Sequence, residues 1–413
     1  MTKVFAVMGY NNTRLADVKK LETYARELHG AELVLCKDGI TATDRETVRH
    51  CLDNDLAATE ENIDSIIAHL GSHALELVGV LPFSDHGVPA GALLASRLGL
   101  PGADPAAAAC AADKHLYRAR EARHDTLPGH HRTIRAREIH TADDAVAFWH
   151  EVAPRRIFLK PKGEGNSRGC TRVEDEAHIG SAFAGLSPYL AGGVMAEECV
   201  DGAREYSVDH VAGFSWLTEK TTTTGAYRAE IEQVVPAPLA PPTAGAVRRS
   251  GYAAAEICGY AGSAFHNEVF LLAGDRGTAV VEPNLRPAGM RIWDLAALAF
   301  DFDPWTAWLD HSRSGTALPA PPRQRGYAGI RMLRPRADGF LASLPQVADV
   351  HERFPGLHEV VFTKAVGDPV STRVENNADF VGHVICAAPT HQETRALLLA
   401  CTRAIEESTE VTA

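Results

Sequence analysis

The sequence predicts an α/β protein in which a small doubly wound N-terminal domain is followed by lobes of α+β character. Two observations indicate this fold class. Apolar strand-like runs alternate with amphipathic helical patterns up to about residue 105, and a succession of short strands replaces that alternation from residue 155. The length of 413 residues predicts two or three domains, since a domain typically holds about 100–200 residues.

The N-terminal elements are short enough to read one by one. The run at 3–10 is a buried strand followed by a polar turn, and the apolar positions of 14–29 form a helical stripe that ends where Gly30 suits a C-cap. Alternating strands and helices predict a parallel sheet covered on both faces. The other expected elements are strands at 32–36 and 77–83 and helices at 60–70 and 88–98.

The remaining chain has a different pattern. Residues 106–125 fit connecting helices, and the strands that follow favour an antiparallel lobe. A helix at 391–407 closes a tail of mixed strand and helix. The expected strands are 156–160, 170–173, 194–200, 205–212, 265–272 and 278–282, with a helix at 244–258.

Composition excludes several classes of protein. Lys and Arg total 41 against 53 Asp and Glu, a net charge of −12, which disfavours a broad basic face for nucleic acid. The chain lacks an apolar run of the ~20 residues that a membrane span needs, and its first residues lack a signal-peptide pattern, so a cytoplasmic location is expected. The cysteines form no C-x-x-C pair and are expected to be buried thiols, while the pair His130-His131 is expected to face solvent.

A glycine-rich segment is the first candidate for chemistry. Glycines allow backbone N–H groups to approach phosphate oxygens, and neighbouring lysines neutralise them. The spacing matches neither a Walker A loop nor a dinucleotide-binding fingerprint, so an ordinary hairpin remains the alternative. The segment is Lys160-Pro161-Lys162-Gly163-Glu164-Gly165-Asn166-Ser167-Arg168-Gly169.

An acidic segment is the second candidate. Glu268 and Glu282 lie in two neighbouring predicted strands, and Asn284 follows the second strand. Opposed strands place such side chains about 5 Å apart on one face, and carboxylate and amide oxygens suit Mg²⁺. For Glu268 alone, a solvent-facing strand end is the competing interpretation. A third segment, Glu197-Glu198-Cys199-Val200-Asp201-Gly202 with Glu205 beyond it, could present backbone groups to an adenine edge or be only a strand and its turn.

Together and in this order, the segments resemble the ATP-grasp superfamily from about Asp113 to Gly289. Asp113-Lys114 with Arg118 resembles the start of that family's nucleotide-binding domain. The stretches 217–220 and 235–237, and the string Phe265-His266-x-Glu268, resemble the carboxylate–amine ligase branch and its L-amino acid ligases. The resemblance implies a pre-ATP-grasp domain at 1–112, a small lobe with connecting helices at 113–210, and a large lobe with a C-terminal extension at 211–413.

The resemblance also implies roles for single residues. Lys114 and Lys160 would contact ATP phosphates under a closing loop that contains Gly163, Gly165, Ser167 and Gly169. Glu197 and the backbone around Glu198 and Val200 would hold adenine, and Glu205 would accept the ribose hydroxyls. Glu268, Glu282 and Asn284 would hold Mg²⁺ (or Mn²⁺). Arg286, Arg291 and Lys220 would be catalytic. Two departures stand out: two residues separate Gly202 from Glu205 where one is usual, and Gln233 stands where the branch often has His.

The implied reaction is ATP-dependent joining of a carboxylate to an amine through an acyl phosphate, releasing ADP and phosphate. The alternatives are a nucleotide-biosynthesis or biotin-carboxylase type of ATP-grasp ligase, a phosphotransferase, and a non-catalytic ATP-binding regulatory protein. The expected partners are small-molecule carboxylate and amine substrates, with neither nucleic acid nor membrane, and a homodimer is an open alternative for the assembly.

Overall fold

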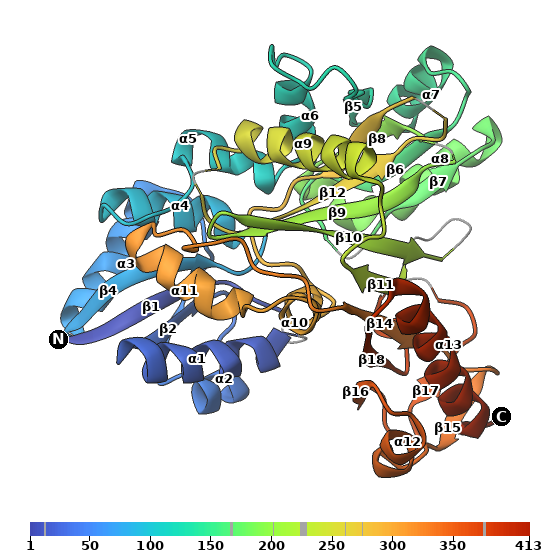
Figure 1. The fold of residues 1–413 in the computed structure, drawn as a ribbon. Coiled ribbons are helices and arrows are strands. Elements are labelled where there is room, and N and C mark those ends of the chain that lie inside the picture. The colour runs from blue at the N-terminus through green and yellow to red at the C-terminus, as the bar shows by residue number, and fades with distance from the viewer. Residues whose placement is uncertain are drawn as a thin grey trace.

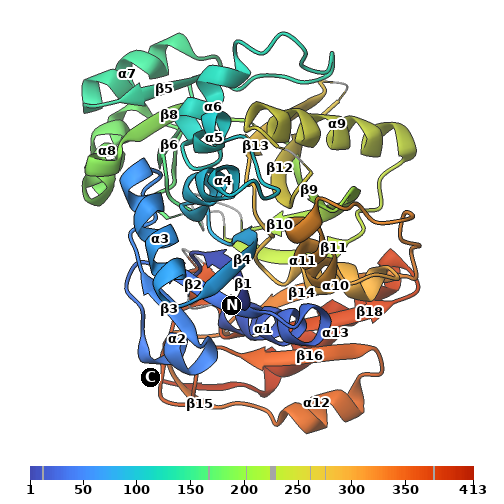
Figure 2. The same ribbon diagram turned by 90° about the vertical axis from the view of Figure 1, so that its left-hand side faces the viewer.

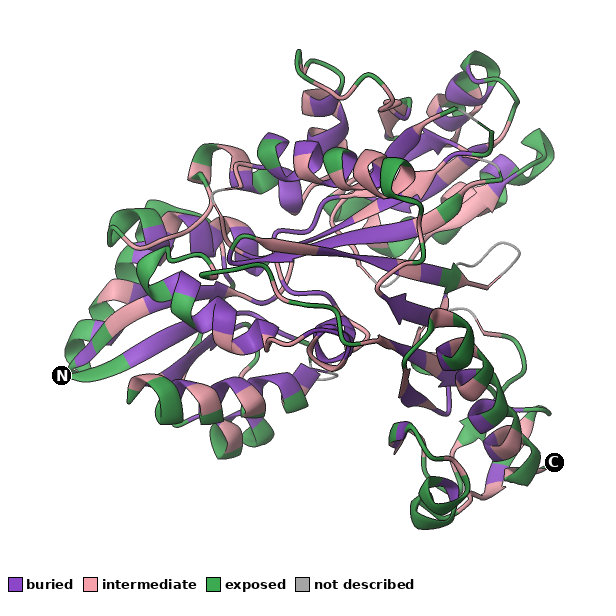
Figure 3. Cartoon of the chain, viewed as in Figure 1, coloured by how far each residue is buried: buried purple, intermediate pink, exposed green. Residues whose placement is uncertain are grey.

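The computed structural model describes residues 1–11, 14–165, 168–200, 202–223, 229–260, 262–274, 276–374 and 377–413. In Figure 1 the N-terminal domain lies beside a long central sheet, with a small lobe above its far end and a C-terminal lobe below. Figure 3 shows that buried residues concentrate in the strands of these sheets. None of the described helices is long and apolar enough to cross a membrane.

The N-terminal domain contains the expected parallel sheet, with strand order β3-β2-β1-β4. Alternate residues of β1 face opposite sides: Phe5 packs in one cluster with Leu21 of α1, and Val4 packs in another with Ile63 of α3. Figure 2 shows α3 and α4 on one side of this sheet and α1 on the other. The elements are β1 (Thr2–Met8), α1 (Leu15–His29), β2 (Glu32–Lys37), α2 (Ala42–Thr47), β3 (His50–Asp53), α3 (Glu60–Ser72), β4 (Leu75–Pro82) and α4 (Gly87–Arg97).

Short helices lead into a small antiparallel sheet with strand order β5-β8-β6-β7. The glycine-rich segment connects β6 to β7, so the predicted hairpin is confirmed. The elements are α5 (Pro105–Ala108), α6 (Lys114–Glu121), β5 (Ala136–Ile139), α7 (Ala142–Glu151), β6 (Ile157–Pro161), β7 (Thr171–Val173), α8 (Ile179–Gly185) and β8 (Val194–Glu198).

A long sheet with strand order β13-β12-β9-β10-β11-β14-β18-β16 forms the centre of the molecule. The domain boundary expected at residue 210 falls inside β9, which pairs with β10 and β12. Helix α9 packs on β12, β13 and β9, and α10 packs on β14 and β11. The elements are β9 (Arg204–Val211), β10 (Phe214–Thr222), β11 (Glu230–Val235), α9 (Pro241–Ile257), β12 (Phe265–Leu271), β13 (Thr278–Glu282), α10 (Ile292–Ala299), α11 (Pro304–Ser314), β14 (Tyr327–Leu333), β16 (Leu357–Phe362) and β18 (Gly382–Ala388).

The C-terminal lobe adds a three-stranded sheet of order β17-β15-β19. The predicted C-terminal helix is confirmed as α13, and it packs on β14 and β18. The elements are β15 (Gly339–Ser343), α12 (Val347–Arg353), β17 (Pro369–Val370), α13 (His391–Ser408) and β19 (Glu410–Thr412).

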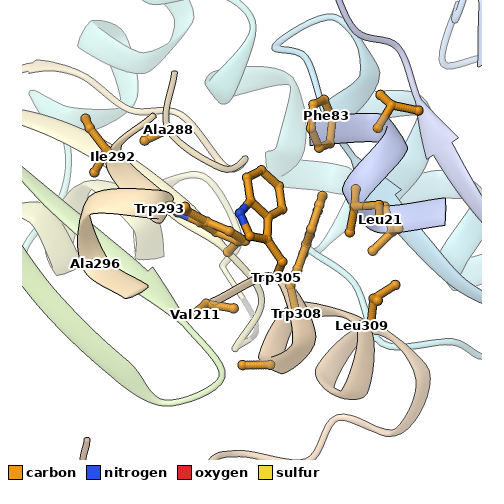
Figure 4. Packing of buried hydrophobic residues seen from close by; sticks show 14 of the residues in the cluster. Leu21, Phe83, Val211, Ala288, Ile292, Trp293, Ala296, Trp305, Trp308 and Leu309 are labelled. Atoms are coloured by element: carbon orange, nitrogen blue, oxygen red, sulfur yellow. The ribbon is translucent and has the colours of Figure 1, made fainter. Parts of the chain in front are cut away.

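A tryptophan-rich core joins the N-terminal domain to the central sheet. Trp293 of α10 and Trp305 and Trp308 of α11 are buried together with Phe83, which follows β4, and Leu21 of α1 (Figure 4). Phe83 and Trp305 stack with ring centroids 5.9 Å apart. This apolar contact holds the N-terminal domain against the large lobe and so positions the segments that follow β1 and β4.

Candidate functional site

Glu268 on β12 and Glu282 on β13 are cross-strand partners, which confirms the predicted pairing of these strands. The register shifts directly after Glu268. Asn284 stays close to β12 because its backbone N–H donates to Asn267 Oδ1 (2.8 Å) and its carbonyl accepts from the N–H of His266 (2.8 Å). The three side chains that the sequence predicts as oxygen ligands therefore lie at one end of the β12–β13 pair.

This donor set fits Mg²⁺. It supplies two carboxylates and an amide oxygen, which are hard ligands. The described residues hold no cluster of three or more His, Cys, Asp or Glu suited to a metal. A cation at this position would therefore need the amide oxygen of Asn284 as well as the two carboxylates. Asn284 Nδ2 is buried without a hydrogen-bond partner among the described residues. No hydrogen bond from the amide nitrogen to the described residues holds this side chain, so the amide can turn its oxygen toward a cation.

Two lysines from different elements reach this region. Lys114 begins α6, where Asp113 caps the helix by accepting from the N–H of Leu116. Its Nζ lies 3.0 Å from Glu282 Oε2 and donates to the carbonyl of Glu164 at 2.7 Å. Burial lowers the pKa of Lys114, but Glu282 and Asp85 outweigh it and raise the pKa above its usual value. Lys114 is therefore a permanent cation beside the carboxylate pair.

Lys160 on β6 contacts Glu197 on the neighbouring strand β8, with 2.6 Å between Nζ and Oε2. Arg118 of α6 donates to the other oxygen of Glu197 at 2.8 Å. Burial alone would raise the pKa of Glu197, yet Arg118 and Lys160 lower it to about 2. Sequence reasoning noted Arg118 only as part of the Asp113-Lys114 string and did not foresee this contact.

The side chains of Glu198 and Val200, whose backbone is expected at the adenine site, point elsewhere. Glu198 accepts from the N–H of Arg135 (3.0 Å) and pairs with Arg132 (3.0 Å), because successive residues of a strand face opposite sides. Val200 is half-buried beside the small cluster that contains Ile134. The backbone beyond β8, and not these side chains, is therefore what could face a base.

The β6–β7 hairpin lies close to the N-terminal domain. A side-chain carbon built at Gly165 would lie 3.6 Å from Asp85 Oδ2, and one built at Gly163 would lie 3.5 Å from the carbonyl of Ala112. Gly169 has φ of +69° and would meet the ring of Tyr189 at 2.6 Å, so only glycine fits there. Ser167, the remaining loop residue expected at the phosphates, lies outside the described residues.

Lys220 of β10 contacts three carboxylates at once. Its Nζ lies 2.7 Å from Glu230 and 3.2 Å from Glu205, and it also pairs with Glu268. Burial and the nearby carboxylates Glu268 and Glu230 raise the pKa of Glu205 to about 7, against the effect of Lys220. Glu230 was not foreseen, because it reaches Lys220 through a shift in the register of β10 and β11 that strand alternation does not predict.

His266 links Glu268 to a second buried carboxylate. Its Nδ1 lies 2.6 Å from Asp209 Oδ1, and its Nε2 lies 3.5 Å from Glu268. Ser207 and Thr218 both donate to the other oxygen of Asp209 at 2.7 Å. The imidazole is thus fixed by a polar network, and it contacts the same oxygen of Glu268 as Lys220 does. Asp209 was not foreseen, because its position on a predicted strand was its one distinguishing feature in the sequence.

Arg286 projects toward the N-terminal domain. Its Nε and Nη2 donate to the two oxygens of Asp85 at 2.6 and 3.0 Å, and its Nη2 also lies 3.4 Å from Asn284 Oδ1. Burial lowers the pKa of Arg286, but Asp85 outweighs it and raises the pKa. Asp85 was not expected in the site, although its position after the carboxyl end of a parallel strand was a usable signal.

Arg291 belongs to a different group of charges. It precedes α10 in a left-handed conformation, with φ of 57°. Its guanidinium pairs with Asp294 and lies 2.9 Å from Glu359 of β16. Arg291 and Arg286 are both expected to be catalytic, but they have different partners in the structure.

His130 and His131 do not face solvent as expected. His131 has a fully buried ring that contacts Glu121 at 2.8 Å and Ser250 at 3.1 Å. His130 contacts the carbonyl of Ala246 at 2.9 Å. The cause is α9, which packs over this stretch and supplies both Ala246 and Ser250.

The chain has the ATP-grasp fold. The L-amino acid ligase from Bacillus licheniformis superposes with a TM-score of 0.77 at 17% identity, covering 100% of this chain and 98% of that chain. Carboxyaminoimidazole ribonucleotide synthase from Aspergillus clavatus, solved with ATP, gives 0.71 at 15% identity, covering 98% and 99%. The biotin carboxylase domain dimer of Hydrogenobacter thermophilus 2-oxoglutarate carboxylase, solved with MgADP, ADP and bicarbonate, gives 0.65 at 15%, covering 100% and 91%.

A sequence comparison is more specific for one part of the chain. Residues 331–410 match the family model of the L-amino acid ligase C-terminal domain 2. This segment begins in β14, contains β15, β17 and all of α13, and ends at the first residue of β19. Comparison with curated proteins gives no match. The fold is thus shared with an L-amino acid ligase, a carboxyaminoimidazole ribonucleotide synthase and a biotin carboxylase domain, and residues 331–410 are similar to a C-terminal domain of the L-amino acid ligases.

Proposed function

We propose that this protein is an ATP-dependent carboxylate–amine ligase that joins small molecules of the amino acid type and releases ADP and phosphate. The observation that carries the proposal is the convergence of Glu268, Glu282 and Asn284 with Lys114 and Arg286 at one end of the β12–β13 pair. Oxygen donors for Mg²⁺ and cations for phosphate meet there on an ATP-grasp fold. The match of residues 331–410 favours the amino acid branch over the nucleotide and biotin-carboxylase types.

The chemistry requires such a convergence. A carboxylate is a poor acyl donor, and transfer of the γ-phosphoryl group makes an acyl phosphate that an amine can attack. The first step brings two anions together, so cations must offset their repulsion. Lys114 and Lys160 would bind the phosphate oxygens, and Arg286 would hold the reacting carboxylate or the γ-phosphate through its planar fork. Mg²⁺, when held by Glu268, Glu282 and Asn284, would neutralise charge that develops on the phosphates.

The surrounding residues would hold the nucleotide and exclude water. The backbone beyond β8, at Glu198 and Val200, would face adenine beside Glu197. Glu205, fixed by Lys220, would accept the ribose hydroxyls. The hairpin with Gly163, Gly165, Ser167 and Gly169 would cover the phosphates, which protects an acyl phosphate from hydrolysis. The contacts favour a positioning role for Lys220 and Arg291 instead of the catalytic role expected from the sequence.

The test is a screen of ADP formation over pairs of amino acids with Mg²⁺, with mass spectrometry of the products. We expect ADP formation to require the acid substrate and an amide to accumulate. With a carboxylate labelled by an oxygen isotope, one labelled oxygen should leave with the phosphate. Label in AMP would indicate adenylation, a stable phosphorylated product would indicate a phosphotransferase, and ADP formation that ignores the acid would indicate a plain ATPase. Each of these results contradicts the proposal.

A further inference from the structure

The segments that follow β1 and β4 at the carboxyl edge of the N-terminal sheet reach Arg286 and the residue after it. In the strand order β3-β2-β1-β4, the chain leaves β1 toward β2 on one side and returns from β3 to β4 on the other. Ligands of open parallel sheets bind outside the carboxyl ends of the strands at such a switch point. β1 ends at Met8 and β4 at Pro82, and the segments that follow them carry Arg14 and Asp85.

Two guanidinium groups meet at this edge of the sheet. Arg14 Nη1 and Arg286 Nη1 both donate to the carbonyl of Pro287, at 3.0 and 3.1 Å. Arg14 also donates from Nε to Asp17 at 2.9 Å, and it lies over the ring of Phe83 at 4.1 Å from the centroid. Like charges that share one acceptor away from water need anions beside them.

One N–H donor of this pair of guanidinium groups has no acceptor among the described residues. Arg14 is only 8% exposed, and its Nη2 is buried without a hydrogen-bond partner among the described residues. A buried charged donor without an acceptor is unfavourable and rare in folded proteins. Burial, and then Arg286, lower the pKa of Arg14 against the effect of Asp17. The cluster therefore lacks one hydrogen-bond acceptor, and the Asp85 carboxylate in the fork of Arg286 shows that an oxyanion can serve as one.

We propose that Arg14 binds the carboxylate of the amine substrate, which makes Arg14 the residue that selects an amine carrying a free carboxylate. The inference rests on the proposed function. Lys114 and Lys160, which would bind the phosphates, pair with Glu282 and Glu197. The phosphates would therefore lie on that side of the site. Arg286 lies between Glu282 and Arg14. In an α-amino acid one carbon separates the carboxylate from the nitrogen, so an anchor at Arg14 would hold the nitrogen near the carboxyl group bound by Arg286.

The test compares the twenty standard amino acids, each beside its α-carboxamide, as the amine substrate. The variants are Arg14→Gln, which removes the charge, and Arg14→Lys, which keeps the charge without the fork. Arg26→Gln is the matched control, because Arg26 lies on the same helix with a side chain that is 65% exposed. We expect Arg14→Gln to raise KM for the amino acid at least tenfold and to remove the preference for it over its carboxamide. Arg14→Lys should restore part of that preference.

A second experiment measures activation of the acid substrate by a route that does not use the amine-binding site. Hydroxylamine, a small nucleophile without a carboxylate, traps an acyl phosphate as a hydroxamate. We expect Arg14→Gln to weaken amino acid use far more than hydroxamate formation. Equal losses for amino acid, carboxamide and hydroxylamine, or a raised KM for ATP, would place the oxyanion on the phosphoryl group and overturn the inference. If the wild-type protein makes neither hydroxamate nor acid-dependent ADP, the proposed function itself fails.

Discussion

Glu268 and Glu282 are cross-strand partners, yet each is held by a lysine from a different part of the chain: Lys220 of β10 holds Glu268, and Lys114 of α6 holds Glu282. Each carboxylate is therefore oriented by its own cation. A pair of oriented carboxylates next to an amide oxygen is what a divalent cation would use when it displaces the lysine contacts.

We expect Glu282→Gln to lower Mg²⁺-dependent ADP formation at least about 100-fold, because a neutral amide is a weaker ligand for the cation that offsets the phosphate charge. The variant should remain folded, since the side chain of Glu282 is 20% exposed and Lys114 keeps its bond to the Glu164 carbonyl. The measurement is ADP release, with circular dichroism as the check on folding. Glu27→Gln, at an exposed position on α1, is the control. ADP release close to wild type in a folded Glu282→Gln would refute the metal assignment.

Arg286→Lys keeps the charge but loses the planar fork that holds both oxygens of Asp85. We expect turnover to fall about 100-fold or more, because one ammonium cannot bind a carboxylate or phosphate through two parallel bonds. ATP affinity, measured by calorimetry, should stay within a few-fold. Arg403→Lys, at a side chain that is 80% exposed, should change neither quantity. Turnover within a few-fold of wild type would contradict the role given to the fork.

The lowered pKa of Glu197 predicts that the protein loses stability in acid. Its pKa falls from 4.5 to about 2, so the unfolded chain binds more protons at this site between those two pH values. The stabilising contribution is complete above about pH 4.5 and is lost as pH falls toward 2, with a total of about 3 kcal/mol. We expect the difference in unfolding free energy between wild type and Glu197→Gln to shrink from pH 6 to pH 3.5, as measured by urea unfolding.

The control for that measurement is Glu176→Gln, at a side chain that is 46% exposed. Its difference from wild type should stay within about 0.5 kcal/mol at each pH. A difference between wild type and Glu197→Gln that stays constant from pH 6 to pH 3.5 would show that Lys160 and Arg118 do not depress the pKa of this carboxyl.

Gln233 is 1% exposed, and neither its Nε2 nor its Oε1 has a hydrogen-bond partner among the described residues. We expect Gln233→Met, a replacement of similar shape, to raise the unfolding free energy by about 1–3 kcal/mol, because it removes two buried unpaired polar atoms. Thermal or urea unfolding measures the change. Gln346→Met, at an exposed position, should stay within about 0.5 kcal/mol of wild type. A destabilised Gln233→Met would mean that the amide has a polar partner in solution.

Local patterns in the sequence determined many of the helices and strands and one part of the site. The parallel N-terminal sheet, the end of α1 at Gly30 and the β6–β7 hairpin are all confirmed, because strand and helix periodicity and turn chemistry act over neighbouring residues. The pairing of Glu268 with Glu282 was predictable for the same reason, since only a short connection separates their strands.

Contacts between residues far apart in the chain were decided by the tertiary structure alone. Asp85 meets Arg286 across 201 positions, and Arg14 meets Pro287 across 273. These contacts depend on how the tryptophan-rich core seats the N-terminal domain on the large lobe. The carboxylates around Lys220 likewise depend on the order in which β12, β9, β10 and β11 pair. Periodicity specifies which face of an element is buried, but it does not specify which element covers that face.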